Sequence, residues 1–367
     1  MSARYALIGA AGYIAPRHMK AIRDTGGDLA LAFDVNDSVG IMDSHFPDAE
    51  FFTEVERFFF SLQRAQATDA GIAYTAICSP NYLHKAHVNL ALHAGTDAIC
   101  EKPLVLYPAD LDELAKVERE TGRRVFSILQ LRLHPAIIAL RDKVAAGDPD
   151  RVHDVDLGYF TSRGAWYHAS WKGVQDKSGG IATNIGIHFY DMLGFVFGRS
   201  KINVVHHRAD DCAAGYLEFD RARVRWLLST NRHHLPPQTP KGQTTYRSIT
   251  VDGEEVEHDR HVALALVTQR LLACDPVGDV SGHAHEARGP HARAAVRRLR
   301  GDAREQLAPE RARQVVDRAA LLGDGRRDLA ADRLDRIRLT EAVQHHRRAF
   351  RRQRPRDREP DARCRPG

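Results

Sequence analysis

A strand, a glycine turn and a helix follow one another within the first 22 residues, and this succession limits the possible folds more than any other part of the sequence. The apolar run from Tyr5 to Ile8 suits a buried strand, and apolar residues at helical spacing follow it. Between them, Gly9, Gly12 and Ala15 form a GxxGxxA pattern. Small residues here let the backbone approach a pyrophosphate at a helix N-terminus. The pattern predicts a dinucleotide site, although an ordinary tight turn can also be rich in small residues.

An acidic residue ends the next predicted strand. The segment LALAF leads into Asp34, 22 residues after Gly12. This is close to the spacing of about 20 residues that is typical of a carboxylate bound to the adenosine ribose. Because a carboxylate repels the additional phosphate of NADP, the sequence favours NAD. The residues expected to contact NAD in these two turns are Gly9, Gly12, Tyr13, Ile14, Asp34 and Asn36.

Polar residues follow two further apolar runs. AYTAIC leads into Ser79, Asn81 and His84, and TDAIC leads into Glu101 and Lys102. Ligands bind beyond the carboxyl ends of the strands in an open parallel sheet, so we expect these five residues to line one crevice together with the cofactor.

A later segment, SGGIATNIGIHFYDMLGFVFG at residues 178–198, predicts one helix. In a continuous helix Asn184, His188 and Asp191 would share a face, because they are four and seven residues apart. A histidine on such a face suits acid–base chemistry, since its unperturbed pKa is about 6.5. The alternative is a histidine that is simply buried in a helix core.

Together these segments resemble the Gfo/Idh/MocA oxidoreductase family. SPNYLH and EKP are similar to its cofactor-domain signatures, and GGIATNIGIHFYD is similar to its GGGxxxDxGxHxxD segment, so the resemblance covers about Arg4 to Glu257. The first turn has one residue more than the family's GxGxxG, and Asn184 replaces the usual Asp. With SRGAWYHASWKG at 162–173, these departures resemble one branch, the UDP-N-acetyl-D-glucosaminuronate 3-dehydrogenases of O-antigen synthesis.

The resemblance implies an enzyme that uses NAD to oxidise the C3 hydroxyl of UDP-N-acetylglucosaminuronic acid (UDP-GlcNAcA) to a 3-keto sugar, in bacterial lipopolysaccharide biosynthesis. His188 would remove the hydroxyl proton, and Lys102 would stabilise the alkoxide. The resemblance also implies reoxidation of bound NADH by 2-oxoglutarate, a downstream aminotransferase, and a homodimer or homotetramer. Another sugar or cyclitol dehydrogenase, or an NAD-binding regulatory protein without turnover, remains the alternative.

Basic and aromatic residues in the segment 162–173 could recognise such a substrate. Arg163 and Lys172 could pair with its anionic groups, while Trp166 and Trp171 could stack on its rings or pack in the core. Arg132 and His134, which follow the last strand of the first domain, are further candidates. The predicted substrate-binding residues are Arg163, Trp166, Tyr167, Lys172, Asn184 and Asp191.

The expected fold is α/β, with a Rossmann-type doubly wound parallel sheet followed by an α+β domain with an open antiparallel sheet. We predict an NAD-binding domain at 1–130, a substrate and oligomerisation domain at 131–258, and an atypical tail at 259–367. The second domain is rich in strand-like segments, and Asp252-Gly253 is typical of a tight hairpin.

The tail differs in composition from the rest of the chain. From Met1 to Asp259 there are 28 Lys and Arg against 33 Asp and Glu, whereas from Arg260 onward there are 25 against 15, and all 25 basic residues are Arg. Arg, Ala, Gly and Pro have GC-rich codons, and a GC-rich gene that is read out of frame yields this bias. We therefore favour out-of-frame translation over a disordered extension or an arm that binds nucleic acid.

The remaining features bound the class of protein. Five cysteines at wide, irregular spacing predict buried reduced thiols, with neither a disulfide framework nor a metal site. No run approaches the roughly 20 apolar residues of a membrane helix, and the N-terminus lacks the pattern of a signal peptide. The sequence thus predicts a cytoplasmic protein that binds neither membrane nor nucleic acid.

Overall fold

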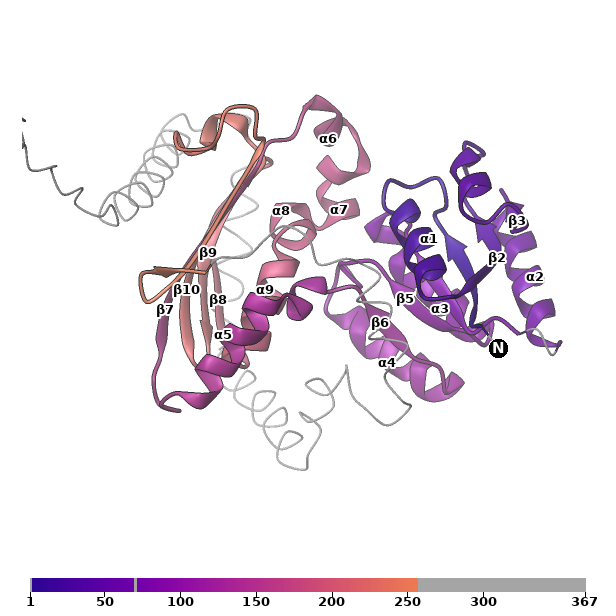
Figure 1. Ribbon diagram of the computed structural model, residues 1–367, viewed down its shortest axis with the longest axis horizontal. Coiled ribbons are helices and arrows are strands. Elements are labelled where there is room, and N and C mark those ends of the chain that lie inside the picture. The colour runs from indigo at the N-terminus through magenta and orange to yellow at the C-terminus, as the bar shows by residue number, and fades with distance from the viewer. Residues whose placement is uncertain (1, 69–70, 257–367) are drawn as a thin grey trace, which may run out of the picture. The chain divides into compact units, whose positions relative to one another are not determined.

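The computed structural model describes residues 2–68 and 71–256. Every helix and strand described below lies in one compact unit of the chain (Figure 1). The predicted tail at 259–367 lies outside the described residues, as do Cys274 and Cys364. Cys78, Cys100 and Cys212 are buried free thiols, as expected.

The first half of the described chain forms a six-stranded parallel sheet in the order β3-β2-β1-β4-β5-β6, which is the Rossmann order. Its strands are β1 (Arg4–Ile8), β2 (Asp28–Phe33), β3 (Glu50–Phe52), β4 (Tyr74–Ile77), β5 (Asp97–Cys100) and β6 (Val125–Ser127). The helices between them are α1 (Ala15–Asp24), η1 (Gly40–Ser44), α2 (Val55–Gln66), η2 (Asn81–Leu83), α3 (His84–His93) and α4 (Ala109–Thr121).

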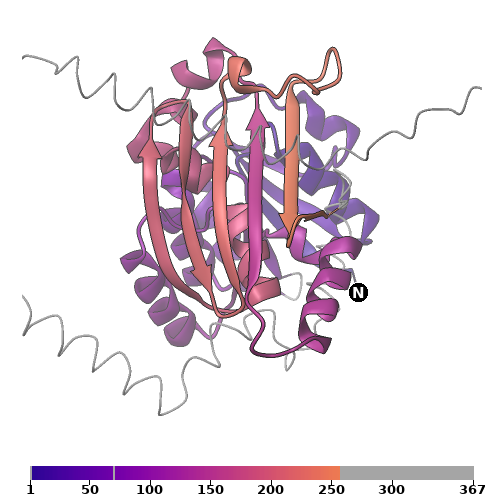
Figure 2. The same cartoon turned by 90° about the vertical axis from the view of Figure 1, so that its left-hand side faces the viewer.

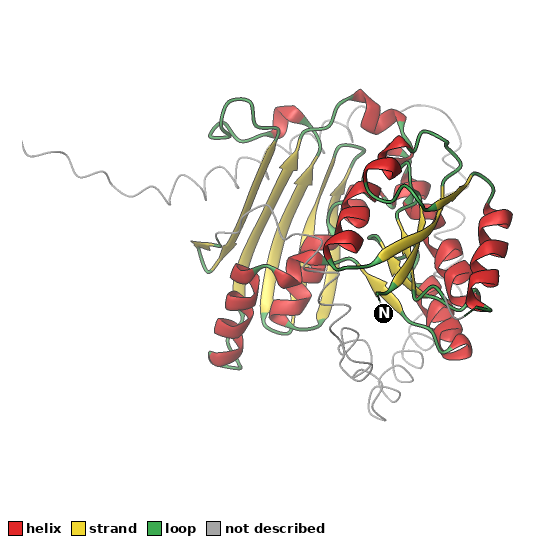
Figure 3. Ribbon diagram, turned by 45° about the vertical axis from the view of Figure 1, so that its right-hand side comes forward, coloured by secondary structure: helices red, strands yellow, loops and turns green. Residues whose placement is uncertain are grey.

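Helices cover both faces of this sheet (Figure 3). Alternate residues of β1 enter different cores, because successive side chains of a strand point to opposite faces. Ala6 and Ile8 pack with residues of α2, α3 and α4, whereas Tyr5 and Leu7 pack with residues of α1. The prediction of a doubly wound sheet is therefore confirmed.

The last residues of the central strands of this sheet lie side by side. Ile8 of β1 lies beside Phe33 of β2 and Ile77 of β4, and Ile77 lies beside Cys100 of β5. The loops that follow these strands consequently leave from one edge, as the sequence predicted for its polar signatures.

The second sheet has six strands in the order β12-β11-β7-β10-β9-β8 (Figure 2). It is open, but it is mixed rather than wholly antiparallel, because β7 and β10 pair in parallel. Its strands are β7 (His153–Thr161), β8 (Ser200–Arg208), β9 (Cys212–Phe219), β10 (Ala222–Ser229), β11 (Thr245–Val251) and β12 (Glu254–Glu255). The predicted hairpin is confirmed, since Asp252 and Gly253 both have positive φ, 53° and 85°.

One face of the second sheet carries its hydrophobic core. Residues of α5 and α9, such as Ile137, Phe189 and Phe197, pack there against β7, β9, β10 and β11. The other face is more polar, and on it Arg225 of β10 binds both carboxylate oxygens of Asp156 on β7. The remaining helices are η3 (Gln130–Leu133), α5 (Pro135–Ala146), α6 (Ala165–Ala169), η4 (Trp171–Gly173), α7 (Gln175–Ser178), α8 (Gly180–Asn184), α9 (Ile187–Phe197) and η5 (Arg232–His234).

The single helix predicted at 178–198 was wrong, because this stretch is interrupted twice. Gly179 and Gly180 have φ of +80° and +71°, a left-handed conformation that separates α7 from α8. The second interruption, at Ile185 and Gly186, separates α8 from α9. A Cβ on Gly186 would lie 2.3 Å from the carbonyl oxygen of Ala182 and 2.6 Å from the Tyr190 ring, so glycine permits this close approach.

A further glycine makes room for the largest side chain in the second core. Trp226 of β10 is 4 % exposed and lies beside Gly215 of β9. A Cβ on Gly215 would be 2.6 Å from the indole ring and 2.3 Å from the carbonyl oxygen of Val204 on β8. Neither neighbour can move easily, since one is backbone and the other a buried ring.

We expect Gly215→Ala to lower the free energy of unfolding by about 1–3 kcal/mol, because the added methyl group overpacks the core. Gly194→Ala in α9 is the matched control, since its Cβ would meet only the Phe219 ring, at 3.8 Å. Alanine in a helix should change stability there by at most about 1 kcal/mol, in the stabilising direction. Urea denaturation of both variants tests this, and equal effects would contradict it.

Candidate active site

The glycine turn after β1 lies directly against the end of β4. Gly9 has a φ of +89°, and its N–H donates to the carbonyl oxygen of Phe33 at 2.7 Å. A Cβ on Gly9 would lie 2.7 Å from backbone atoms of Cys78 and of Ser79, so no other residue fits. Gly12 closes the turn, with its N–H donating to the Gly9 carbonyl oxygen at 3.0 Å.

Helix α1 begins just beyond this turn with Ile14 as its N-cap residue, and no side chain caps it in the described structure. The positive end of its dipole therefore faces the turn, where an anionic group would be stabilised. Tyr13 is 83 % exposed, and the Arg17 guanidinium lies 5.7 Å from the centre of its ring.

Asp34 joins the end of β2 to the glycine turn. One carboxylate oxygen accepts from the Ala11 N–H at 3.0 Å, and the other accepts from the Asn36 N–H at 2.9 Å. The Asn36 side chain is exposed and accepts from Ser38 N–H at 3.4 Å. The carboxylate is thus fixed beside the turn, where a ribose hydroxyl could bind it.

Ser79 and His84, both predicted to contact the cofactor, are buried. The Ser79 hydroxyl lies 2.8 Å from Nδ1 of His87. His84 is 1 % exposed, and its ring nitrogens lie 2.8 Å from the Ser79 carbonyl oxygen and 2.7 Å from that of Pro103. His84 therefore connects the segment after β4 to the segment after β5, so its ring is occupied within the protein.

Asn81 links the first sheet to the interrupted helical stretch. Its side-chain amide donates to the carbonyl oxygen of Ser178 at 2.9 Å and to Oδ1 of Asn184 at 3.2 Å. Asn184 in turn donates from Nδ2 to the Tyr167 hydroxyl at 3.2 Å. All three side chains are buried, so the chain of amides and hydroxyl holds α8 in place.

Lys102 lies where these segments meet. Its ammonium group donates to the backbone carbonyl oxygen of Asn184 at 2.8 Å. That carbonyl belongs to the last residue of α8, and a carbonyl at a helix end needs a partner from outside the helix. Burial lowers the pKa of Lys102, and the charges of Arg163 and Lys172 lower it further, while Glu101 acts in the opposite direction.

Glu101 precedes Lys102 and pairs with a residue that the sequence analysis did not single out. Oε1 of Glu101 lies 3.0 Å from Nε2 of His18 on α1. Burial by itself would lower the pKa of His18, but Cys78 and Glu101 together raise it to about 10. A protonated His18 would be compensated by the carboxylate that it faces, and both side chains are largely buried.

His188 lies in the first turn of α9. Burial, with the charges of Lys102 and Arg247, lowers its pKa to about 3, although Glu101 opposes this. The ring is therefore neutral at pH 7, and one nitrogen can accept a proton. Within the described residues, Nδ1 of His188 is buried and has no hydrogen-bond partner.

The segment 162–173 gathers positive charge and aromatic rings. The Lys172 ammonium lies 5.4 Å from the centre of the Trp166 ring and 5.0 Å from that of Trp171. Trp166 is 58 % exposed, so it is available for contact rather than buried in the core. Arg163 is exposed, and its charge contributes to the lowered pKa of both Lys172 and Lys102.

Asp191, predicted to bind substrate, has a partner within the protein. Nε of Arg132 donates to it at 2.8 Å, and a second guanidinium nitrogen binds its other oxygen. Arg132 lies in η3, so this pair ties α9 to the segment that follows β6. His134, the other candidate in this region, caps α5, with Nδ1 accepting from Ala136 N–H at 3.2 Å.

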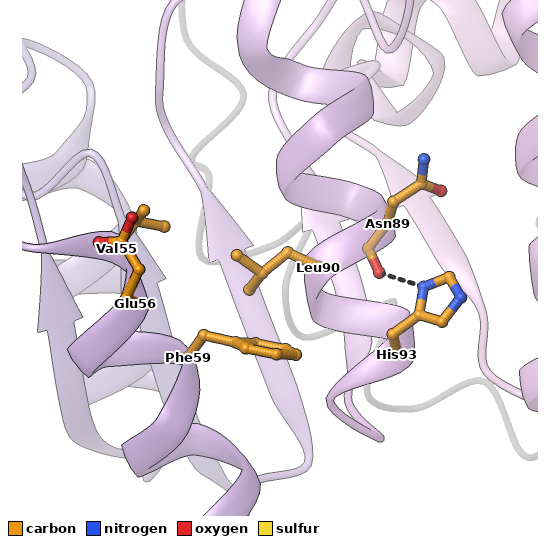
Figure 4. Close-up of a pocket in the computed structure, with 6 residues that line it drawn as sticks. All are labelled: Val55, Glu56, Phe59, Asn89, Leu90 and His93. Carbon is orange, nitrogen blue, oxygen red and sulfur yellow. Dashed lines mark hydrogen bonds between the residues drawn. The ribbon is translucent and has the colours of Figure 1, made fainter.

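Two hollows lie in the described part of the chain. One, of about 320 Å³, lies beside α7 and α8, and Tyr167, Lys172, Thr183 and Trp226 are among its lining residues. The other, of about 370 Å³, lies between α2 and α3 (Figure 4). It shares no residue with the predicted site and is lined by Val55, Glu56, Phe59, Asn89, Leu90 and His93.

Comparison with known proteins decides the family. The model of the Gfo/Idh/MocA oxidoreductases' NAD-binding Rossmann fold matches residues 3–128, and that of their C-terminal alpha/beta domain matches residues 141–255. This chain belongs to the Gfo/Idh/MocA family. It is an oxidoreductase with NAD as its cofactor, and the geometry of Gly9, α1 and Asp34 suits that cofactor.

Several relatives in this family are enzymes that act on sugars or related alcohols. The solved WlbA (WbpB) dehydrogenase from Thermus thermophilus, in complex with NAD and UDP-GlcNAcA, is 47% identical. That match covers 74% of this chain and 88% of the other, with a TM-score of 0.71. The same enzyme in complex with NAD and alpha-ketoglutarate is 46% identical over the same shares, also with a TM-score of 0.71. Inositol 2-dehydrogenase from Rhizobium meliloti is 28% identical, covering 76% of this chain and 83% of its own length.

Two residues of this Gfo/Idh/MocA site were missed from sequence. His18 occupies an inward position of α1, next to Met19 and one turn before Ile22, and a polar residue at such a position was the available signal. Arg247 of β11 is two residues before the buried Ile249 and four before Val251. Since every second side chain of a strand points to the same face, Arg247 lies on the core face of β11. Its guanidinium lies 5.3 Å from the centre of the Tyr159 ring.

Among the described residues, no helix is long and apolar enough to cross a membrane. In the same part of the chain, no three or more His, Cys, Asp or Glu residues come together as metal ligands.

We expect Asp191→Asn to lower the free energy of unfolding by about 1–3 kcal/mol, because it breaks a half-buried ion pair with Arg132. The KM for the sugar should change by less than about threefold, since the carboxylate serves α9 rather than the substrate. Glu120→Gln, in the exposed pair with Lys116, is the control and should cost at most about 0.5 kcal/mol. A KM raised tenfold or more in Asp191→Asn, with stability unchanged, would restore the role in substrate binding.

Proposed function

We propose that this protein uses NAD to oxidise the C3 hydroxyl of UDP-GlcNAcA to a 3-keto sugar. The observation that carries the proposal is the 47% identity to the Thermus thermophilus dehydrogenase, which was solved with NAD and UDP-GlcNAcA. The arrangement of Lys102, Asn184 and His188 supports it, because it brings a basic nitrogen and an ammonium group to one place beside the predicted cofactor site.

The two catalytic residues divide the work on the hydroxyl group. A secondary alcohol can lose hydride only if its proton leaves as well, and the neutral imidazole of His188 has a ring nitrogen free to accept that proton. The ammonium of Lys102 donates to the oxygen that becomes negative. NAD, when bound, accepts the hydride. The Asn184 carbonyl takes one Lys102 N–H, which orients the group and leaves its other donors for the substrate.

The cluster at 162–173 supports a nucleotide sugar acid as the substrate class. Lys172 and Arg163 supply positive charge for a diphosphate or carboxylate, and the exposed Trp166 offers a ring face for stacking. In this proposal Tyr167 and Asn184 shape the sugar pocket, and Gly9, Gly12, Tyr13, Ile14, Asp34 and Asn36 hold the cofactor. Ser79, Asn81, His84 and Glu101 support the crevice from beneath.

The wider assignment extends this proposal. We place the reaction in O-antigen synthesis in the cytoplasm, before an aminotransferase, with 2-oxoglutarate reoxidising NADH and the protein acting as a homodimer or homotetramer. The alpha-ketoglutarate complex of the Thermus thermophilus enzyme supports that oxidant. We also propose domains at 1–130 and 131–258, and a tail at 259–367 that results from out-of-frame translation.

A second candidate is oxidation of a cyclitol or a simpler sugar. Similarity to inositol 2-dehydrogenase over 76% of this chain favours it. It requires neither the positive charge of Lys172 and Arg163 nor the exposed ring of Trp166, and we therefore rank it second.

The direct test incubates the purified protein with NAD and UDP-GlcNAcA, with and without 2-oxoglutarate, and follows absorbance and product mass. We expect a product two hydrogen atoms lighter and, with 2-oxoglutarate present, multiple turnovers. myo-Inositol and UDP-N-acetylglucosamine are the comparison substrates. Turnover of inositol alone would favour the second candidate, while thermal stabilisation by NAD without turnover of any substrate would indicate a binding protein.

We expect His188→Ala and Lys102→Ala each to reduce kcat by about 10²–10⁴-fold, since each removes a group that acts on the hydroxyl. Stabilisation by NAD should persist in both variants. Lys116→Ala, at an exposed position of α4, is the matched control and should retain full turnover. Near-normal turnover in either active-site variant would refute that residue's role.

A further inference from the structure

We propose that His18 is a positioning residue that holds the Glu101 carboxylate away from Lys102, so that the Lys102 ammonium remains on the Asn184 carbonyl and within reach of the substrate oxygen. This inference deepens the proposed function and rests on it. His18 itself touches neither the substrate nor the reacting atoms.

The geometry assigns one partner to each group. The Glu101 carboxylate lies 3.0 Å from the His18 ring, and its second oxygen accepts from the backbone N–H of Lys102 at 3.3 Å. The Lys102 ammonium donates to Asn184 instead. In the described part of the chain, no ion pair joins the side chains of Glu101 and Lys102, although the two residues are consecutive.

Because Glu101 is buried, its carboxylate needs a partner from the protein. The His18 and Glu101 side chains are 4 % and 13 % exposed, so water cannot solvate either charge well. An unpaired carboxylate there would attract the nearest cation, and Lys102 is the next residue. Once paired with His18, the carboxylate is compensated, and the Lys102 charge remains to be used on a developing alkoxide.

The pair also connects two parts of the site. His18 lies on α1, which starts at the glycine turn, and Glu101 directly follows β5. On the other side His84 holds the carbonyl of Pro103. Residues 101–103 are thus held by α1, by α8 through Asn184, and by α3, each through a separate residue.

The test compares the wild type with His18→Gln and with the double variant His18→Gln/Glu101→Gln. The first readout is the pH dependence of Lys102 acetylation by acetic anhydride, measured by peptide mass spectrometry on the NAD-bound protein. It needs no sugar, so it stands even if the proposed substrate is wrong. The charged groups that face Lys102 are Glu101, Arg163 and Lys172, and they are unchanged in the single variant.

In His18→Gln we expect the acetylation midpoint to rise by about one pH unit, because the Glu101 carboxylate then pairs with Lys102. We expect kcat to fall about tenfold or more, with the KM for NAD changed little. The double variant lacks the Glu101 carboxylate that would otherwise pair with Lys102. Its acetylation midpoint should therefore return toward that of the wild type, and its turnover should exceed that of the single variant. His93→Gln, at an exposed position of α3, is the control.

An unchanged midpoint in His18→Gln, or a double variant as impaired as the single one, would overturn the proposal and leave His18 a structural residue. If His18→Gln does not fold, the charge of His18 can be measured on the wild-type protein by NMR. With ¹⁵N-labelled histidine, an imidazolium signal should persist at pH 8.5, and its absence would refute a charged His18.

Discussion

The hydrogen bond from the Lys102 ammonium to the Asn184 carbonyl is the interaction on which the site depends. It exists because α8 ends at Asn184, and that ending depends on the glycines around it. A continuous helix would have used this carbonyl for its own backbone. The interruption after Asn184 therefore supplies an acceptor that holds a charged side chain of the first domain.

Among the described residues, the positive charges around this hydrogen bond are not neutralised by nearby carboxylates. Asn184 is neutral, whereas an aspartate there would place an anion beside Lys102. Glu101 is compensated by His18, and His188 is kept neutral by burial and by its cationic neighbours. The region thus retains the positive charge of Lys102, Lys172 and Arg163, which suits an anionic substrate and an alkoxide transition state. The same environment keeps the His188 ring neutral, as the proposed role of proton acceptor requires.

The sequence predicted those features that depend on local pattern. Strands followed by Gly9, Asp34, Ser79 and Lys102 could be recognised one at a time, and a parallel sheet necessarily brings such strand ends together. The break between α8 and α9 could not be predicted, because apolar residues continue on both sides of Gly186. Partners distant in sequence were equally inaccessible: Arg132 is 59 residues from Asp191, and His18 is 83 from Glu101. Their pairing is a consequence of tertiary packing.

The parallel pairing of β7 and β10 has a consequence for assembly. Between these neighbours the chain passes through α6, α7, α8, α9, β8 and β9, so the candidate catalytic residue of the second domain, His188, lies in the long connection between two paired strands. Such non-local pairing forms slowly, because the intervening chain must be ordered before the strands can meet. The helix that carries His188 therefore belongs to the connection that must be ordered before the sheet on which it packs can close.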